Sequence, residues 1–176
     1  TIGLVGTGNG PELAQFPAGL AVVAGTVSGT PVPTPPPSVS PMPAASALFY
    51  AGGFAMDGAG NLYIADPNND LAYKVTGLST ASPQIVLVAG NYSGTPPSAT
   101  PEPATSATTC PNGIAVDGAG NLYIADDCNN SLIEKVDAST GEIVVIAGTP
   151  SGGGTVPTTT PEPAASAKLM VPQGVV

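Results

Sequence analysis

The side chains best suited to chemistry in this sequence are two adjacent carboxylates, Asp126 and Asp127. Such a pair can serve as acid and base, and with the amide oxygen of Asn129 it could offer ligands to calcium. No EF-hand spacing surrounds the pair, however, and Asp126 recurs as Asp66 in a second copy of the same segment. Because a repeated residue more often builds the repeat than performs chemistry, we expect Asp126 to bind the backbone of the loop that follows it.

Other catalytic arrangements are also disfavoured. The chain contains no histidine, which excludes a Ser-His-Asp triad. Residues 6–10 are glycine-rich like a phosphate-binding loop, but neither a lysine nor a helical pattern follows them, so they are predicted to form a turn. Tyr63 and Tyr123 occupy equivalent positions in the two copies, which favours a packing role. The sequence therefore predicts no catalytic residue, no bound metal and no cofactor.

The two cysteines are predicted to form a disulfide. Cys110 and Cys128 would face each other across a hairpin if residues 117–120 form a tight turn. The equivalent residues of the first copy are Tyr50 and Asn68, so both cysteines are missing there together, which favours a bridge over two free thiols. Two cysteines without histidine make no zinc site. A structural disulfide would indicate an oxidising compartment.

Two sequence triplets could accept N-linked glycans. They begin at Asn91 and Asn129, and both lie in expected loops. Loops rich in threonine and proline could also carry O-linked glycans, or they could simply be exposed linkers stiffened by proline.

An internal repeat organises the chain. The ten residues Asp57–Asp66 recur without change as Asp117–Asp126, 60 residues later. A second motif, Pro-x-Pro-Ala-x-Ser-Ala, keeps this spacing and occurs at residues 41–47, 101–107 and 161–167. Residues 172–176 read like the start of another unit and residues 1–6 like the end of one. We count two complete units with a partial unit on each side.

Each complete unit predicts a small antiparallel sheet. Four short strand patterns occur per unit, at residues 53–56, 61–65, 72–75 and 85–89 in the first and at 113–116, 121–125, 132–136 and 143–147 in the second. Asp57–Gly60 and Asp117–Gly120 join the first two strands; we expect Asp57 and Asp117 to cap these turns and Gly60 and Gly120 to supply positive φ. Short strands with glycine-rich turns indicate an all-β fold of four-stranded, propeller-type blades.

The combined pattern resembles the NHL repeat. It consists of Pro-x-Gly-Ile-Ala-Val-Asp, Gly-Asn-Leu-Tyr-Ile-Ala-Asp, an asparagine three residues later, Lys-Val and Val-x-x-Ala-Gly, and it covers residues 50–90 and 110–148. That family builds β-propellers of four-stranded blades. The resemblance implies an open array here, because two blades and partial ones cannot close a ring. Related propeller enzymes commonly use histidine, so the resemblance carries no catalytic site to this chain.

Composition limits the partners and the compartment. The net charge is −9, with three lysines and no arginine, which argues against nucleic acid. Only 9% of residues are charged, which favours an extracellular or cell-surface protein. No apolar run reaches the roughly 20 residues of a membrane span.

These observations give a predicted organisation and function. We divide the chain into partial repeat strands (1–25), a Pro/Thr/Ser-rich loop (26–49), a blade (50–90), a Pro/Thr-rich loop (91–109), a second blade (110–148), and a loop with the first strand of a further blade (149–176). The exposed edges of such an array would recruit further strands. We therefore expect a non-catalytic, self-assembling structural protein. The alternatives are a protein- or carbohydrate-binding segment of a longer secreted protein and a non-catalytic part of a propeller enzyme.

Overall fold

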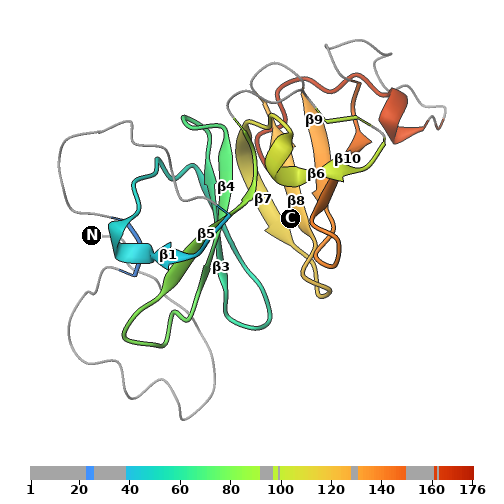
Figure 1. Cartoon of the computed structure of the whole chain (residues 1–176). Coiled ribbons are helices and arrows are strands. Elements are labelled where there is room, and N and C mark those ends of the chain that lie inside the picture. The colour runs from blue at the N-terminus through green and yellow to red at the C-terminus, as the bar shows by residue number, and fades with distance from the viewer. Residues whose placement is uncertain are drawn as a thin grey trace, which may run out of the picture.

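The computed structural model describes residues 23–25, 39–91, 97–98, 100–127, 131–149, 161 and 163–176. The predictions made for Cys128, Asn129 and residues 1–22 lie outside this part of the chain. The elements are β1 (Met42–Pro43), η2 (Ala44–Ser46), β2 (Gly53–Met56), β3 (Leu62–Asp66), β4 (Leu71–Thr76), β5 (Gln84–Ala89), β6 (Glu102–Pro103), η3 (Ala104–Ser106), β7 (Pro111–Val116), β8 (Leu122–Asp126), β9 (Leu132–Val136), β10 (Glu142–Ala147) and η5 (Ala164–Ser166), as labelled in Figure 1.

Two antiparallel sheets contain these strands. Blade one has the order β1-β5-β4-β3-β2 and blade two the order β6-β10-β9-β8-β7. Matching registers, such as Ile64 opposite Tyr73 and Ile124 opposite Glu134, show that the two units fold alike. The expected all-β, open array of propeller-type blades is confirmed.

The number of strands in each blade differs from the expectation of four. A fifth, two-residue strand lies at the edge of each sheet: Pro43 pairs with Gln84 in blade one and Pro103 with Glu142 in blade two. These strands come from the Pro-x-Pro motif, which we had assigned to the loops. Proline has no N–H to donate, so it is tolerated at the edge of a sheet and disfavoured within it. A strand of two residues also shows no alternation by which a sequence could reveal it.

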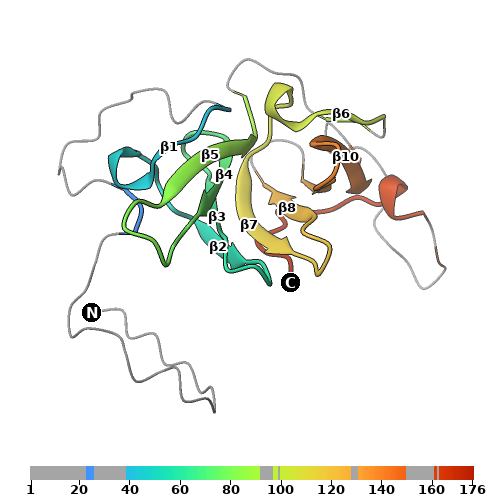
Figure 2. The same cartoon turned by 60° about the horizontal axis from the view of Figure 1, so that its bottom comes forward.

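The main core fills the space between the two blades. Tyr63 and several alanines of blade one face Ile114, Ile124 and Val136 of blade two. Side chains alternate across a strand, so every second residue of β3 and β8 reaches a core. The first strand of blade two, β7, lies against β2 and β3, as Figure 2 shows. The opposite face of blade one forms a second cluster around Ile64, Tyr73 and Ile85.

Candidate functional site

The turn between the first two strands is held in the same way in both blades. In blade two, Oδ1 of Asp117 accepts hydrogen bonds from the backbone N–H groups of Ala119 and Asn121, each at 2.9 Å. Its Oδ2 accepts from Nδ2 of Asn121 at 2.8 Å and from the hydroxyl of Tyr123 at 3.1 Å. The Asn121 side chain and then the backbone donors lower the pKa of Asp117 to about 2. Both oxygens of the Asp117 carboxylate therefore accept hydrogen bonds that stabilise the turn.

Asp57 does the same work in blade one. It accepts from the N–H groups of Ala59 and Asn61 at 3.0 and 2.9 Å, and Lys74 lies 3.6 Å from its Oδ2. Burial alone would raise the pKa of Asp57, but the donors from Asn61 outweigh it and the pKa is lowered. Gly60 and Gly120 end the two turns with φ of +80° and +86°.

The repeated aspartates at the ends of β3 and β8 are fully buried. Asp66 accepts hydrogen bonds from the backbone N–H and the side-chain Nδ2 of Asn69, at 3.2 and 2.7 Å, so it orders the loop after its strand. Its equivalent Asp126 lies beside Asp127, whose Oδ2 instead accepts from Asn112 at 2.9 Å. Among the residues that the structure describes, no group of three His, Cys, Asp or Glu side chains could hold a metal ion.

Sequence reasoning missed one buried acid, Glu134 in the middle of β9. It is fully buried, and its Oε2 accepts a hydrogen bond from Oγ1 of Thr109 at 2.8 Å, while its Oε1 has no hydrogen-bond partner among the described residues. Burial first, and then the charge of Asp126 on the neighbouring strand, holds the pKa of Glu134 well above its ordinary value. The repeat could have revealed this burial. The residue of blade one at the same position is Tyr73, which is buried in an apolar cluster, so Glu134 occupies a core position.

The structure describes one residue of each of the predicted cysteine and glycan pairs, Cys110 and Asn91. Cys110 is 4% exposed, with its Sγ 3.7 Å from the carbonyl oxygen of Pro67, and no described cysteine is free. Its predicted partner Cys128 lies outside the described residues, so the pairing stays a prediction. Asn91 is partly exposed and its carbonyl oxygen accepts from Thr108 at 3.1 Å; whether it carries a glycan also stays a prediction.

Thiol counting checks the bridge. We expect the unfolded, unreduced chain to bind no thiol reagent and the reduced chain to bind two equivalents, because the sequence has two cysteines. The Cys110→Ser variant should bind one equivalent without reduction. Two labels on the unreduced chain would show two free thiols and contradict the bridge.

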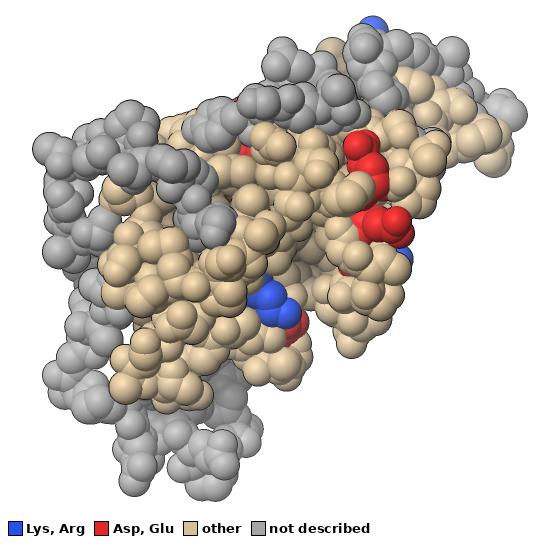
Figure 3. Space-filling view, viewed as in Figure 1, with Lys and Arg blue, Asp and Glu red and all other residues tan. Residues whose placement is uncertain are grey.

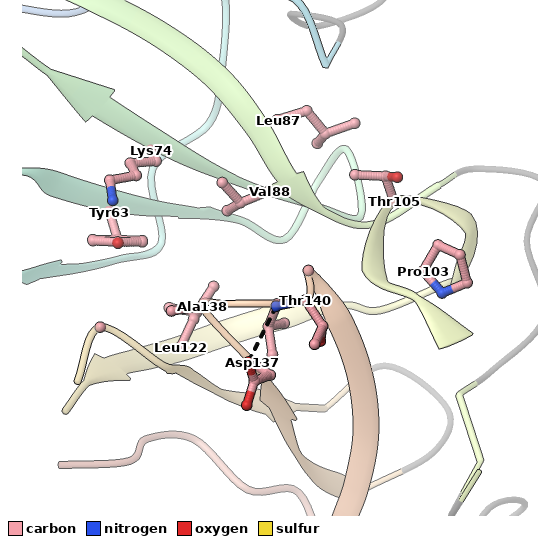
Figure 4. A pocket seen from close by; sticks show the side chains of 13 residues that line it. Tyr63, Lys74, Leu87, Val88, Pro103, Thr105, Leu122, Asp137, Ala138 and Thr140 are labelled. Carbon is pink, nitrogen blue, oxygen red and sulfur yellow. Dashed lines mark hydrogen bonds between the residues drawn. The ribbon is translucent and has the colours of Figure 1, made fainter. Parts of the chain in front are cut away.

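A cleft of about 450 Å³ opens between the blades (Figure 4). Tyr63, Lys74 and Leu87 line it from blade one, and Leu122 and Asp137 from blade two. The lysine lies 5.0 Å from the centre of the Tyr63 ring. Asp137 accepts from the N–H of Thr140 at 3.2 Å, the bond drawn in Figure 4. Because its charged groups already have partners, the cleft offers space for a ligand but no prepared acid–base pair.

The two blades differ in how exposed the apolar side chains of their first strands, β2 and β7, are. In blade two, Ile114 is 6% exposed because blade one covers it. The equivalent residue of blade one, Phe54, is 58% exposed, and the neighbouring Met56 is 61% exposed. Few charged side chains interrupt the face of the molecule in Figure 3. Phe54 and Met56 share one face of β2, so this exposed face of blade one is a candidate interaction surface.

The third Pro-x-Pro-Ala-x-Ser-Ala motif shows a second difference. Ala44 and Ala104 are fully buried, and their N–H groups donate to Pro83 and Gly141, directly before the fourth strands β5 and β10. Ala164 holds the same place in the third motif and forms the same 3₁₀ turn, but it is exposed. The third motif therefore has the shape of a blade edge without a buried contact to a blade of its own.

Comparisons with known proteins support the repeat. Residues 108–136 match the NHL repeat family. A crystal structure of a structural genomics protein of unknown function from Bacteroides thetaiotaomicron VPI-5482 is similar, with a TM-score of 0.52 and 22% sequence identity; the match covers 65% of this chain and 26% of that chain. The chain thus spans about a quarter of that protein, and the likeness concerns the fold. No curated protein sequence matches. None of the described helices is long and apolar enough to cross a membrane.

Proposed function

Because the chain carries an NHL repeat in an open array of propeller-type blades, we propose that it is a non-catalytic, extracellular structural protein that assembles with copies of itself. Neighbouring copies would complete a blade together. One copy would supply the edge motif at residues 161–167 and the segment 172–176, and the next copy would supply the segment that ends at Gly25. The extracellular location rests on the low charge and on the predicted disulfide.

The exposure of Ala164 carries this proposal. Its equivalents Ala44 and Ala104 are completely buried by the edge strand contacts of a blade. The same position is buried in the first two motifs and exposed in the third among the described residues, which supports a further strand packing beside Ala164 in an assembly.

The N-terminal end of the described array also supports a blade shared between two copies. The N–H of the glycine after each fourth strand donates to the first alanine of the following motif: Gly90 to Ala104 at 3.0 Å and Gly148 to Ala164 at 2.9 Å. Gly25 donates to Ala44 at 2.9 Å and has a φ of +86°, close to the +102° of Gly90. Gly25 thus holds the place that Gly90 and Gly148 hold directly after the fourth strands β5 and β10.

The exposed face of blade one would also be covered in the assembly. A blade completed in front of it would pack on Phe54 and Met56 as blade one packs on Ile114 and Val116. Burying large apolar side chains contributes about 1.5–3 kcal/mol each, which favours association. Contacts of this head-to-tail kind build rings or filaments.

Electron microscopy with intact mass of the same sample tests the proposal. We expect regular filaments or rings whose subunit is the 17.0 kDa chain plus any glycan mass, with assembly that increases with concentration. Monomers at all concentrations would overturn the proposal, and so would a longer parent chain that supplies the missing strands itself.

A second candidate function follows from the cleft between the blades. Its aromatic ring, lysine and 450 Å³ volume favour a binding module for a protein or carbohydrate. That function predicts discrete particles whose melting temperature rises with a ligand.

A further inference from the structure

Two buried carboxyl groups lie together in blade two. Asp126 at the end of β8 and Glu134 in the middle of β9 are both 0% exposed. Asp126 is opposite Leu132 and Ile124 is opposite Glu134, so the two acids are diagonal neighbours on one face of the sheet, and their carboxyl groups are close enough to share a hydrogen bond. Because an ionised carboxylate only accepts hydrogen bonds, that bond requires a proton on one of the two acids. Oε1 of Glu134 has no other partner among the described residues, so it is available to that proton.

The surroundings of Glu134 favour a shared proton over two negative charges. Thr109, just before β7, supplies one donor, since its Oγ1 lies 2.8 Å from Oε2 of Glu134. The other nearby charge that acts on Glu134 is Glu102 of β6, which is also an acid, and the residue opposite Glu134 in β10 is the apolar Val145. Lys135 follows Glu134 in β9 but lies on the other face of the sheet. Burial and these acidic neighbours raise the pKa of Glu134.

Blade one has an aromatic pair where blade two has these polar groups. Phe49 and Tyr73 hold the positions of the threonine and the glutamate, and their ring centres are 6.2 Å apart. The repeated aspartate of blade one, Asp66, accepts from the backbone N–H and Nδ2 of Asn69. Burial raises the pKa of Asp66 as well, but the donors from Asn69 oppose that rise. Within the described strands, only blade two thus places a second carboxyl group beside the repeated aspartate.

We propose that the Asp126–Glu134 pair is a proton-operated switch, which holds blade two closed while one proton lies between the two carboxyl groups and loosens that blade when the proton is lost. In the closed state the pair joins β8 to β9, and Thr109 joins Glu134 to the segment before β7. Without the proton, two like charges face each other in a buried site, and entry of water or separation of the strands relieves their repulsion and desolvation.

The direction of the switch follows from the raised pKa. The folded state binds the proton more tightly than the unfolded state does, so the closed state is complete below about pH 4.5, the ordinary value for a glutamate. It is lost as the pH rises through the pKa of the folded state. The switch acts within a single chain and does not depend on the proposed self-assembly.

Amide hydrogen exchange of dilute, full-length protein tests the switch blade by blade. Protection is measured on peptides at about pH 5 and about pH 8 and corrected for the intrinsic effect of pH on exchange. We expect the protection of β8, β9 and residues 109–116 to fall about tenfold or more at the higher pH, while the equivalent strands β3 and β4 of blade one keep theirs. Unchanged protection of blade two, or an equal loss in both blades, would overturn the switch.

Three variants assign the effect to the pair. Glu134→Gln cannot lose a proton, so its blade two should keep its protection at both pH values. Asp126→Asn should also reduce the pH dependence, because it removes the negative charge beside Glu134. Glu142→Gln is the matched control, since it makes the same chemical change at an exposed position of β10 and should behave like the wild type. If Glu134→Gln and Asp126→Asn lose protection as the wild type does, another group is responsible and the proposed switch is wrong.

Discussion

Replacing Gly90 with alanine is expected to destabilise blade one by about 3–5 kcal/mol, which is a large part of the stability of a small domain. Gly90 directly follows β5 and has a φ of +102°, where a side chain is strained. An added Cβ would also overlap the carbonyl oxygen of Asp70 and lie 2.9 Å from Cα of Leu71. These are backbone atoms at the start of β4, so they cannot move away as the end of a flexible side chain could.

The loss of stability in Gly90→Ala should also affect blade two. The N–H of Gly90 donates to the carbonyl oxygen of Ala104, which is buried between the two blades. Movement of Gly90 therefore also displaces the edge motif of blade two. Gly148 is the equivalent residue of blade two, with a φ of +90° and an added Cβ 2.6 Å from the carbonyl oxygen of Ser131, so Gly148→Ala should behave alike.

Denaturant unfolding followed by circular dichroism measures this effect. Gly58→Ala is the control, because its added methyl group meets nothing within 4 Å and its backbone is not left-handed. If Gly90→Ala unfolds at the same denaturant concentration as Gly58→Ala, the strain and overlap argued for Gly90 are wrong.

The fold was predictable from the sequence where the pattern is local and repeated. The identical segments Asp57–Asp66 and Asp117–Asp126 contain a complete hairpin, so the turn and its two strands follow from residue types alone. The edge strands β1 and β6 were missed because their partners, β5 and β10, lie about 40 residues further along the chain. Nothing in Pro-x-Pro itself indicates such a pairing.

The candidate sites were less predictable, because they depend on how the blades pack. Phe54 and Ile114 are equivalent in sequence, and only the structure shows that one is exposed and the other covered. The contact of Glu134 with Thr109 joins residues 25 positions apart. The alternation of β9 places Glu134 on the same face as Leu132 and Val136, so its burial could have been inferred, but its polar neighbour could not.

Removing the charge of Glu134 should stabilise the protein at neutral pH. In Glu134→Gln the amide oxygen still accepts from Oγ1 of Thr109, and the amide nitrogen gives a donor beside the buried carboxylate of Asp126. At pH 7 the wild-type side chain must either stay ionised in a buried place or take up a proton on folding, and the amide avoids both costs, so we expect a gain of about 1–3 kcal/mol in unfolding experiments. Glu142→Gln, at an exposed position of β10, is the control and should change little.

The pH dependence separates charge from packing. Burial and the charges of Asp126 and Glu102 raise the pKa of Glu134 in the folded state above its ordinary value of 4.5. The folded state then holds a proton that the unfolded state has lost, so this contribution to stability is complete below about pH 4.5 and falls as the pH rises through the folded pKa. Glu134→Gln cannot lose that proton, so its stability should fall less between pH 4.5 and 8 than that of the wild type. Parallel pH profiles, in which the gain is equal at every pH, would show that Glu134 takes up no proton on folding and would assign the effect to packing alone.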